Sequence, residues 1–273
     1  TFILSRMGNE KELGLYTVGY EISGTPSTEI AMPVARAALP GLAKLNKQPQ
    51  AFKEMYIGIL ASVLLIAVPA GVGLSVLASP VTLLLLGEQW TDAAVFIEIL
   101  ALFGVTRVIA ASSVSALIAY GLVDMLAKIS IATFLVRLIC LPMGYYLGQS
   151  TGLATGVLSS GLITMVIYLV IQQQQNMLSL TMLLSKCWRI LLATTAMYLV
   201  LANVTTNSLA IIELPLGLNV GLQVIIGILV FSTTLIISWF ISGKPPGAEH
   251  NILLSLQQKL TPLIHRLSSR SDR

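Results

Sequence analysis

Six charged side chains lie inside long apolar stretches of this 273-residue sequence. These residues are Glu21, Glu29, Arg36, Glu98, Arg107 and Arg137. Holding a carboxylate or a guanidinium in hydrocarbon costs about 2.5–3.5 kcal/mol on insertion scales, so such groups usually face a bundle interior or a wet cavity. Three arginines and three glutamates in such positions predict internally paired charge around an anionic or zwitterionic ligand.

The stretch 13–43 combines its charges with three prolines spaced seven residues apart, Pro26, Pro33 and Pro40. Each proline removes a backbone hydrogen bond and bends a helix, and a broken helix at membrane depth is tolerated where it lines a cavity. Glu29 and Arg36 are two turns apart on nearly one face, about 10 Å by helix rise. These features predict a path for a polar or charged substrate. Alternatively, Arg36 snorkels to the cytoplasmic face and Glu21 lies near the outer face.

Two further stretches carry the remaining charges. In 93–120, Glu98 precedes Arg107 by nine residues, and we expect the two to share one helical face; alternatively, Glu98 only marks the outer end of the helix. Arg137 lies near the middle of 127–148, too far from either membrane face to snorkel easily. Three Gly-xxx-Gly spacings begin at Gly144, Gly152 and Gly217, and close helix packing explains them.

The composition says what kind of element must position these residues. Hydrophobic residues make up 55% of the chain and charged residues only 10%, against about 25% in an ordinary soluble domain. This excludes a water-soluble enzyme, a nucleic-acid-binding domain and a disordered linker. The sequence therefore predicts an all-α fold, a polytopic bundle of transmembrane helices. Two cysteines and two histidines predict neither a disulfide framework nor a metal site, and we find no catalytic set and no cofactor motif.

Seven stretches are long enough to cross a hydrocarbon core, which takes about 20 residues. They are 13–43, 55–86, 93–120, 127–148, 151–171, 189–212 and 215–241. Residues 1–242 are thus predicted to form the bundle, and 243–273 a basic tail that is either a membrane-surface helix or loosely ordered. Because the chain opens on Thr1 and on what reads as the end of an apolar segment, we expect it to begin partway through a longer protein, after its first half.

The charges between these stretches alternate in sign. Two basic residues, Arg6 and Lys11, share one set of loops with Glu10, Glu12, Glu88, Asp92 and Glu213. Eleven basic residues occupy the other set of loops and the tail: Lys44, Lys47, Lys53, Lys128, Lys186, Arg189, Lys244, Lys259, Arg266, Arg270 and Arg273. Basic residues accumulate in cytoplasmic loops, so this asymmetry predicts a cytoplasmic C-terminus and accounts for the net charge of +4 without a nucleic-acid partner.

Residues 2–45 carry a specific resemblance, in the segments FILSRMG, ELGLYTVGYEI and EIAMPVARAALPGLAKL. They resemble the polysaccharide flippases of the Wzx type, which belong with the multidrug exporters of the MATE group and the peptidoglycan lipid flippase. The family patterns "LG.Y" and "P..R...P.L..L" fall on Leu13, Gly14, Tyr16, Pro33, Arg36, Pro40, Leu42 and Leu45. GEQWTDAAVFIEILALFG at 87–104 is similar to a second family block, whereas beyond about residue 150 only hydropathy and topology resemble the family.

The resemblance implies the second lobe of a two-lobed transporter that works by alternating access around a central polar cavity. Its substrate would be an undecaprenyl-pyrophosphate-linked oligosaccharide carried across the bacterial plasma membrane for lipopolysaccharide or exopolysaccharide synthesis. Arg36, Arg107 and Arg137, with Glu29, would contact this substrate, and Glu21 and Glu98 would be countercharges or ion-coupling acids. The expected partners are this lipid-linked oligosaccharide, membrane lipids and other polysaccharide-assembly membrane proteins.

Two other classes stay open. A MATE-like drug or cation exporter would need an acidic cavity, whereas arginines are prominent among the charges here. A membrane-embedded enzyme, such as a polysaccharide polymerase or a glycosyltransferase, typically needs a large external loop or a soluble catalytic part, and the external loops predicted here are short.

Overall fold

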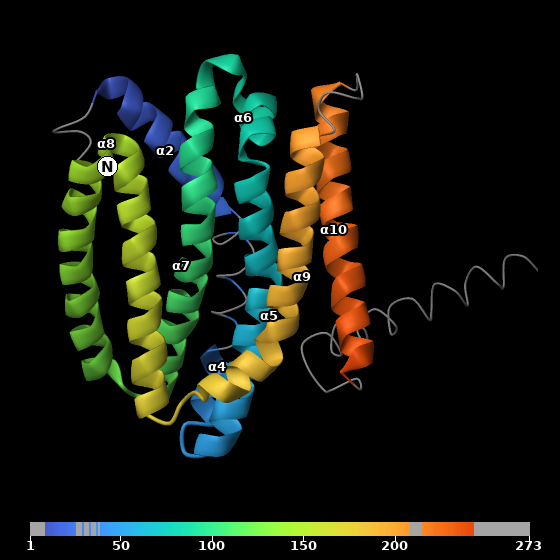
Figure 1. Ribbon diagram of the computed structural model, residues 1–273. Coiled ribbons are helices and arrows are strands. Elements are labelled where there is room, and N and C mark those ends of the chain that lie inside the picture. The colour runs from blue at the N-terminus through green and yellow to red at the C-terminus, as the bar shows by residue number, and fades with distance from the viewer. Residues whose placement is uncertain are drawn as a thin grey trace, which may run out of the picture.

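The regular elements are helices throughout the part of the chain that the computed structural model describes, residues 9–25, 29, 33, 37, 39–207 and 215–242. They are α2 (Glu10–Thr25), α4 (Leu39–Lys44), α5 (Pro49–Val76), α6 (Ala78–Leu86), the 3-10 helix η2 (Glu88–Ala93), α7 (Ala94–Tyr120), α8 (Val123–Gln174), α9 (Leu180–Asn207) and α10 (Leu216–Ile241) (Figure 1). The predicted all-α class is confirmed.

Five helical stretches in the described residues are long and apolar enough to cross a membrane: α5, η2 with α7, α8, α9 and α10. The 52-residue α8 is two antiparallel arms, because the backbone leaves helical geometry at Gly148 and Gln149 (Figure 1). The two arms correspond in sequence to the predicted stretches 127–148 and 151–171. Of the stretch 13–43, the structure describes α2 at one end and α4 at the other, with only isolated residues between them.

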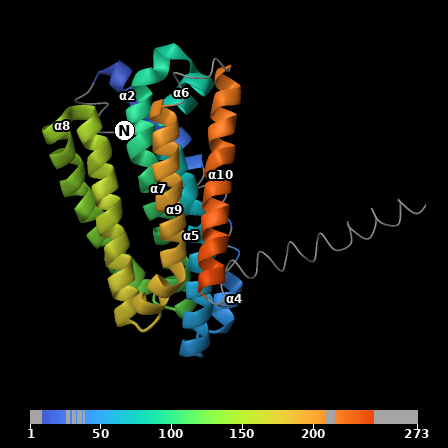
Figure 2. The same ribbon diagram turned by 45° about the vertical axis from the view of Figure 1, so that its right-hand side comes forward.

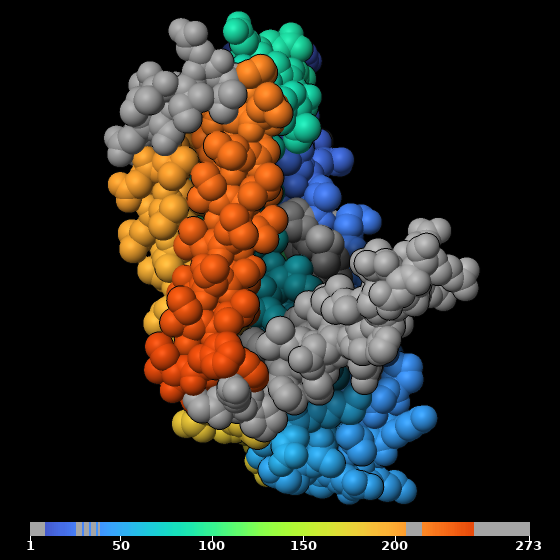
Figure 3. All heavy atoms as spheres, turned by 90° about the vertical axis from the view of Figure 1, so that its right-hand side faces the viewer, coloured from blue at the N-terminus to red at the C-terminus, as the bar shows by residue number. Residues whose placement is uncertain are grey.

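The helices form a row in which each packs on the next, in the order α8, α7, α5, α9, α10 (Figures 1 and 2). Helix α10 stands at the outside of this row, opposite α8, and its surface dominates one face of the molecule (Figure 3). The largest apolar core lies between α5, α7 and α9, around Phe52, Leu60, Leu117 and Ile190. Helix α2 packs across α7 and η2.

Local sequence explains several helix ends. Pro49 occupies the first turn of α5, where its missing N–H costs nothing. Gly121 ends α7 with a φ of 87°, a left-handed conformation that a glycine adopts without strain. The stretch 55–86 differs from the expectation of one continuous element, because the helix breaks at Leu77 (φ −90°, ψ 13°) into α5 and α6.

Charges of opposite sign gather at opposite ends of the bundle. At one end, the Lys53 Nζ at the start of α5 donates a 2.6 Å hydrogen bond to Asn176 in the link between α8 and α9. At the other end, Lys11 of α2 pairs with Asp92 of η2 at 3.1 Å. The first end carries the basic link after α4, and the second carries the acidic turns at the starts of α2 and η2 (Figure 1).

Glycines bring the two arms of α8 together. A Cβ on Gly156 would lie 2.6 Å from the carbonyl oxygen of Cys140, and one on Gly144 would collide with the carbonyl of Gly152. Gly144, Gly152 and Gly156 thus mark close packing, as expected, whereas an added Cβ at Gly148 meets no described atom closer than 3.8 Å. Gly221, in contrast, has no atom within 4 Å of an added Cβ among the described residues. The tight hairpin fixes where Arg137, on its first arm, meets α7.

A buried polar cluster joins α5, α7 and α8. The Tyr56 hydroxyl donates to Gln172 Oε1 at 3.1 Å and lies 3.4 Å from the Ser113 hydroxyl, and all three side chains are buried. We expect Tyr56→Phe to lower the free energy of unfolding by about 1–3 kcal/mol, because it leaves the Gln172 oxygen buried without that donor. Thermal unfolding of the purified full-length protein checks this. Tyr198→Phe, at an exposed ring on α9, is the control, and equal melting of both variants would contradict the prediction.

Candidate functional site

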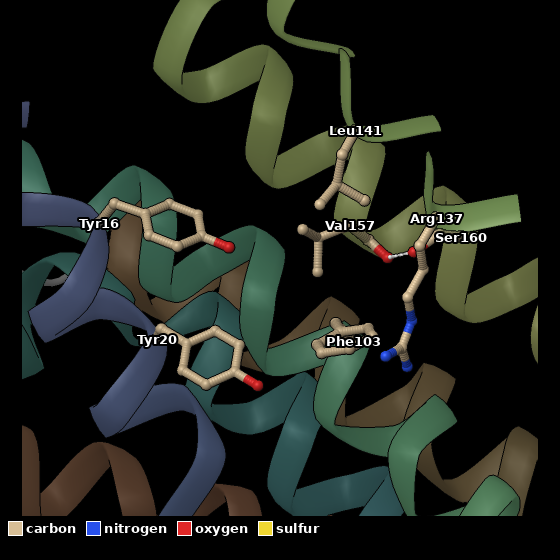
Figure 4. Close-up of a pocket in the computed structure, with 7 residues that line it drawn as sticks. All are labelled: Tyr16, Tyr20, Phe103, Arg137, Leu141, Val157 and Ser160. Carbon is tan, nitrogen blue, oxygen red and sulfur yellow. Dashed lines mark hydrogen bonds between the residues drawn. The ribbon is translucent and has the colours of Figure 1, made fainter. Parts of the chain in front are cut away.

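Two adjoining cavities lie between α7 and α8, and the first of them also touches α2. The first, called here the tyrosine cavity, has a volume of about 300 Å³ and is lined by Tyr16, Tyr20, Phe103, Arg137, Leu141, Val157 and Ser160 (Figure 4). The second, the arginine cavity, has a volume of about 200 Å³ and is lined by Phe103, Thr106, Arg107, Ala110, Ala111, Val114, Arg137, Gly161 and Thr164. Phe103 and Arg137 line both, so the two cavities are neighbours.

The cavities follow one another along the helix axes. On α7, the tyrosine cavity touches only Phe103, whereas the arginine cavity extends to Val114, about 16 Å further along by helix rise. On α8 the tyrosine cavity is lined by residues closer to the bend at Gly148. The tyrosine cavity is therefore nearer the acidic end of the bundle, and the arginine cavity is nearer its middle.

Two of the three predicted arginines meet at this site from different helices. Arg137 projects from the first arm of α8 toward the side chain of Phe103 (Figure 4). Arg107 of α7 is half-buried, and its guanidinium carbon lies 5.7 Å from the centre of the Tyr20 ring. This is a cation–π contact, which holds the guanidinium beside α2. Arg137 is exposed, so the site places two permanent positive charges, one half-buried and one exposed, at one space beside α7 and α8.

Hydroxyl groups complete the polar lining. Thr164 lines the arginine cavity and is only 5% exposed, and its hydroxyl has no hydrogen-bond partner among the described residues. Thr106 donates to the backbone carbonyl of Phe103 at 2.8 Å. Ser160 donates to that of Val157 at 2.7 Å (Figure 4), and both hydroxyl oxygens can still accept. The arginine cavity therefore offers two guanidinium groups, which suit an anion, and the Thr164 hydroxyl lies buried beside them without a partner among the described residues.

The glutamates lie elsewhere. Glu21 on α2, Glu98 on α7 and Glu29 are exposed, and none lines either cavity. The expectation that Glu98 shares a face with Arg107 is wrong, because nine residues make two and a half helical turns and place the two on opposite sides. Arg36 lies outside the described residues, so its predicted role stays a prediction.

Gly161 lets α8 approach α7 at the arginine cavity. A Cβ there would lie 2.5 Å from the Thr106 hydroxyl and 2.6 Å from the Phe103 ring. We expect Gly161→Ala to lower the free energy of unfolding by about 1–3 kcal/mol through overpacking, and to push the Phe103 ring into the cavities. The melting temperature of the purified full-length protein checks this. Gly58→Ala is the control, since an added Cβ at Gly58 meets no described atom within 4 Å. Equal melting temperatures for Gly161→Ala and the Gly58→Ala control would refute the prediction.

Sequence reasoning missed the tyrosines and the hydroxyls of the site. Tyr16 and Tyr20 are four residues apart, which places them on one helical face, and this spacing is the signal that could have found them. Thr106, Ser160 and Thr164 carry no such signal, because serine and threonine are common in membrane helices. Within the described residues, no three His, Cys, Asp or Glu side chains gather to hold a metal ion.

Known proteins match both the sequence and the fold. Residues 1–95 match the family described as "Polysaccharide biosynthesis protein". The chain is 27% identical over 123 residues to the teichuronic acid biosynthesis protein TuaB of Bacillus subtilis (strain 168), a match covering 45% of the chain and 26% of TuaB. It is 23% identical over 158 residues to the lipopolysaccharide biosynthesis protein WzxC of Escherichia coli (strain K12), covering 58% of the chain and 32% of WzxC.

A solved structure supports the fold. The lipid II flippase MurJ in an inward closed conformation superposes with a TM-score of 0.53 at 17% identity, over 84% of this chain and 46% of MurJ. The chain thus spans less than half of MurJ, and its sequence matches about a third or less of the curated relatives. The resemblance predicted from residues 2–45 is confirmed: the chain is similar in sequence to polysaccharide flippases of the Wzx type and similar in fold to MurJ.

Proposed function

We propose that the protein moves an undecaprenyl-pyrophosphate-linked oligosaccharide across the bacterial plasma membrane by alternating access. The observation that carries the proposal is the arginine cavity, where Arg107 and Arg137 converge from α7 and α8 beside the unused hydroxyl of Thr164. The matches to polysaccharide biosynthesis proteins and the MurJ-like fold support the same substrate class.

A pyrophosphate would explain why this site tolerates two arginines. Guanidinium groups bind phosphate oxygens through paired, charge-assisted hydrogen bonds, and these bonds are stronger in a low-dielectric site than in water. A carried anion would neutralise the two positive charges that apolar helices otherwise have to accommodate. Binding and release are all that this role requires of the residues, with no bond made or broken.

The sidedness of the bundle belongs to the same proposal. The basic end, with Lys53 and the link after α4, would face the cytoplasm, and so would the end of α10 and the tail after it. The acidic end, with Lys11 paired to Asp92, would face outward. Loading would then occur from the basic end, where the cytoplasmic leaflet supplies the lipid-linked substrate.

A cation exporter finds no support at this site. The described residues that line the two cavities include two arginines and no carboxylate. A cationic drug in either cavity would meet at least one positive charge close by, and like charges repel. Glu21 and Glu98 line neither cavity.

The first test uses single substitutions in the full-length protein, expressed at normal level in its source bacterium. Arg107→Ala and Arg137→Ala should each reduce surface polysaccharide by roughly tenfold or more, because each removes a charge-assisted contact worth about 1.5–3 kcal/mol. Lys128→Ala is the matched control, since Lys128 is an exposed cation on α8 that lines neither cavity. If both arginine variants export as much polysaccharide as Lys128→Ala, the proposal fails.

A further inference from the structure

We propose that the two cavities divide the headgroup of the substrate between them: the arginine cavity takes the diphosphate and the tyrosine cavity takes the first sugar. This inference rests on the proposed function and adds to it a sugar subsite formed by Tyr16, Tyr20 and Ser160. It also gives the substrate a direction, with its sugar toward the acidic end of the bundle.

The tyrosine cavity has a preorganised aromatic wall. The rings of Tyr16 and Tyr20 stack with their centres 6.3 Å apart and 25° between their planes. Phe96 packs edge-on against Tyr16 at 5.8 Å, and Phe103 lies 6.5 Å from Tyr20. Tyr16 is only 4% exposed, so its ring is held firmly. A wall fixed in this way loses little side-chain entropy when a ligand binds.

The hydroxyl groups of this wall point into the cavity. Figure 4 shows the phenol oxygens of Tyr16 and Tyr20 directed from α2 into the space in front of Val157 and Phe103. Ser160 lines the opposite side, with its proton donated to the Val157 carbonyl and its oxygen still able to accept. The cavity therefore offers two phenol groups, each able to donate and accept, beside the buried hydroxyl of Ser160.

This chemistry fits a sugar better than a phosphate. A pyranose ring has apolar C–H faces, which pack on aromatic rings, and hydroxyl groups that need neutral donors and acceptors. The wall formed by Tyr16 and Tyr20 supplies both. Among the described residues that line the tyrosine cavity, the one charged side chain is Arg137, at the border with the arginine cavity. A volume of about 300 Å³ is at the lower limit for small-molecule sites and suits one small unit rather than a whole oligosaccharide.

The shared residues explain how the two subsites connect. Phe103 and Arg137 line both cavities, so a ligand that fills one is adjacent to the other. Arg107 lies over the Tyr20 ring, so Tyr20 holds one guanidinium while its hydroxyl faces the sugar cavity (Figure 4). The link between first sugar and diphosphate would therefore pass Phe103, between the two groups that recognise it.

Binding measurements on the purified full-length protein test this division. The two probes are undecaprenyl pyrophosphate and the same lipid carrying the oligosaccharide of the source strain. Tyr16→Phe and Tyr20→Phe keep their rings, and the latter keeps the contact with Arg107, so the fold is preserved. We expect each to weaken binding of the glycosylated lipid roughly two- to tenfold, the range of one net hydrogen bond, and to leave binding of the sugar-free lipid unchanged. Tyr146→Phe, at a ring 90% exposed, is the control and should change neither.

The outcomes separate this inference from the proposed function. If the wild-type protein binds neither lipid, or if Arg107→Ala and Arg137→Ala bind both as well as wild type, the proposed function falls and the subsite falls with it. If binding depends on the arginines but the tyrosine variants affect both lipids equally or not at all, the sugar subsite alone is overturned. Selective loss of the glycosylated lipid supports it.

Discussion

Leucine in place of Gly152 is expected to abolish the folded protein. The Cβ of any residue at this position would collide with the Gly144 carbonyl on the facing arm of α8, and Gly144 is restricted in the same way by Gly152. Both obstacles are backbone atoms, so no side chain can turn aside to make room. Overpacking of cores typically costs 1–3 kcal/mol, and a backbone collision lies above that range, at about 3 kcal/mol or more.

The measurement is the amount of monodisperse full-length protein recovered from membranes, with its melting temperature. Gly148→Ala is the matched control in the same hairpin, because an added Cβ at Gly148 meets its nearest atom, the Thr151 hydroxyl, at an ordinary 3.8 Å. We expect Gly148→Ala to yield protein near the wild-type level and Gly152→Leu to yield almost none. Recovery of Gly152→Leu at the level of Gly148→Ala would mean that the arms do not pack this closely.

Reversing both charges at the site should eliminate transport. In a protein carrying Arg107→Glu and Arg137→Glu, two carboxylates would face the diphosphate, so attraction is replaced by repulsion. Losing two charge-assisted contacts alone weakens binding of the diphosphate roughly a hundredfold, and the repulsion weakens it further. We therefore expect surface polysaccharide to fall at least about a hundredfold, to the level of a strain that lacks the protein.

Two comparisons make this result interpretable. Arg107→Lys with Arg137→Lys keeps the charge but loses the paired hydrogen-bonding geometry, so it should retain partial export. A charge reversal at Lys128→Glu, on the exposed side of α8, should leave export near wild type. Membrane quantity is measured for every variant. Export by the doubly reversed protein at the level of Lys128→Glu would exclude a diphosphate from the arginine cavity.

The helices and the arginines could be predicted from sequence because hydropathy is a local property. The apolar runs around Arg107 and Arg137 are long enough to require helices. An arginine in the middle of a span is expected to face the bundle interior or a wet cavity. The two arms of α8 could be predicted as separate spans because the polar turn near Gly148 interrupts the apolar run between them.

The partners of these arginines could not be predicted, because they depend on which helices pack together. Nothing in the sequence of α2 indicates that Tyr20 lies beneath Arg107, or that Thr164 faces the same space from the far arm of α8. The error at Glu98 has a simpler cause, since a separation of nine residues places two side chains on opposite sides of a helix. A charged side chain within an apolar span identified each candidate residue in the sequence. Helix packing determines which of these candidates line the same cavity.

Transport by reconstituted full-length protein tests the central claim most directly. Vesicles would contain the fluorescently labelled lipid-linked oligosaccharide, and a membrane-impermeant quencher would report how much reaches the other leaflet. We predict rapid exchange with wild-type protein and with Lys128→Ala, and exchange at least about tenfold slower with Arg107→Ala combined with Arg137→Ala. Exchange by the double arginine variant at the wild-type rate would contradict the claim that these two arginines carry the diphosphate.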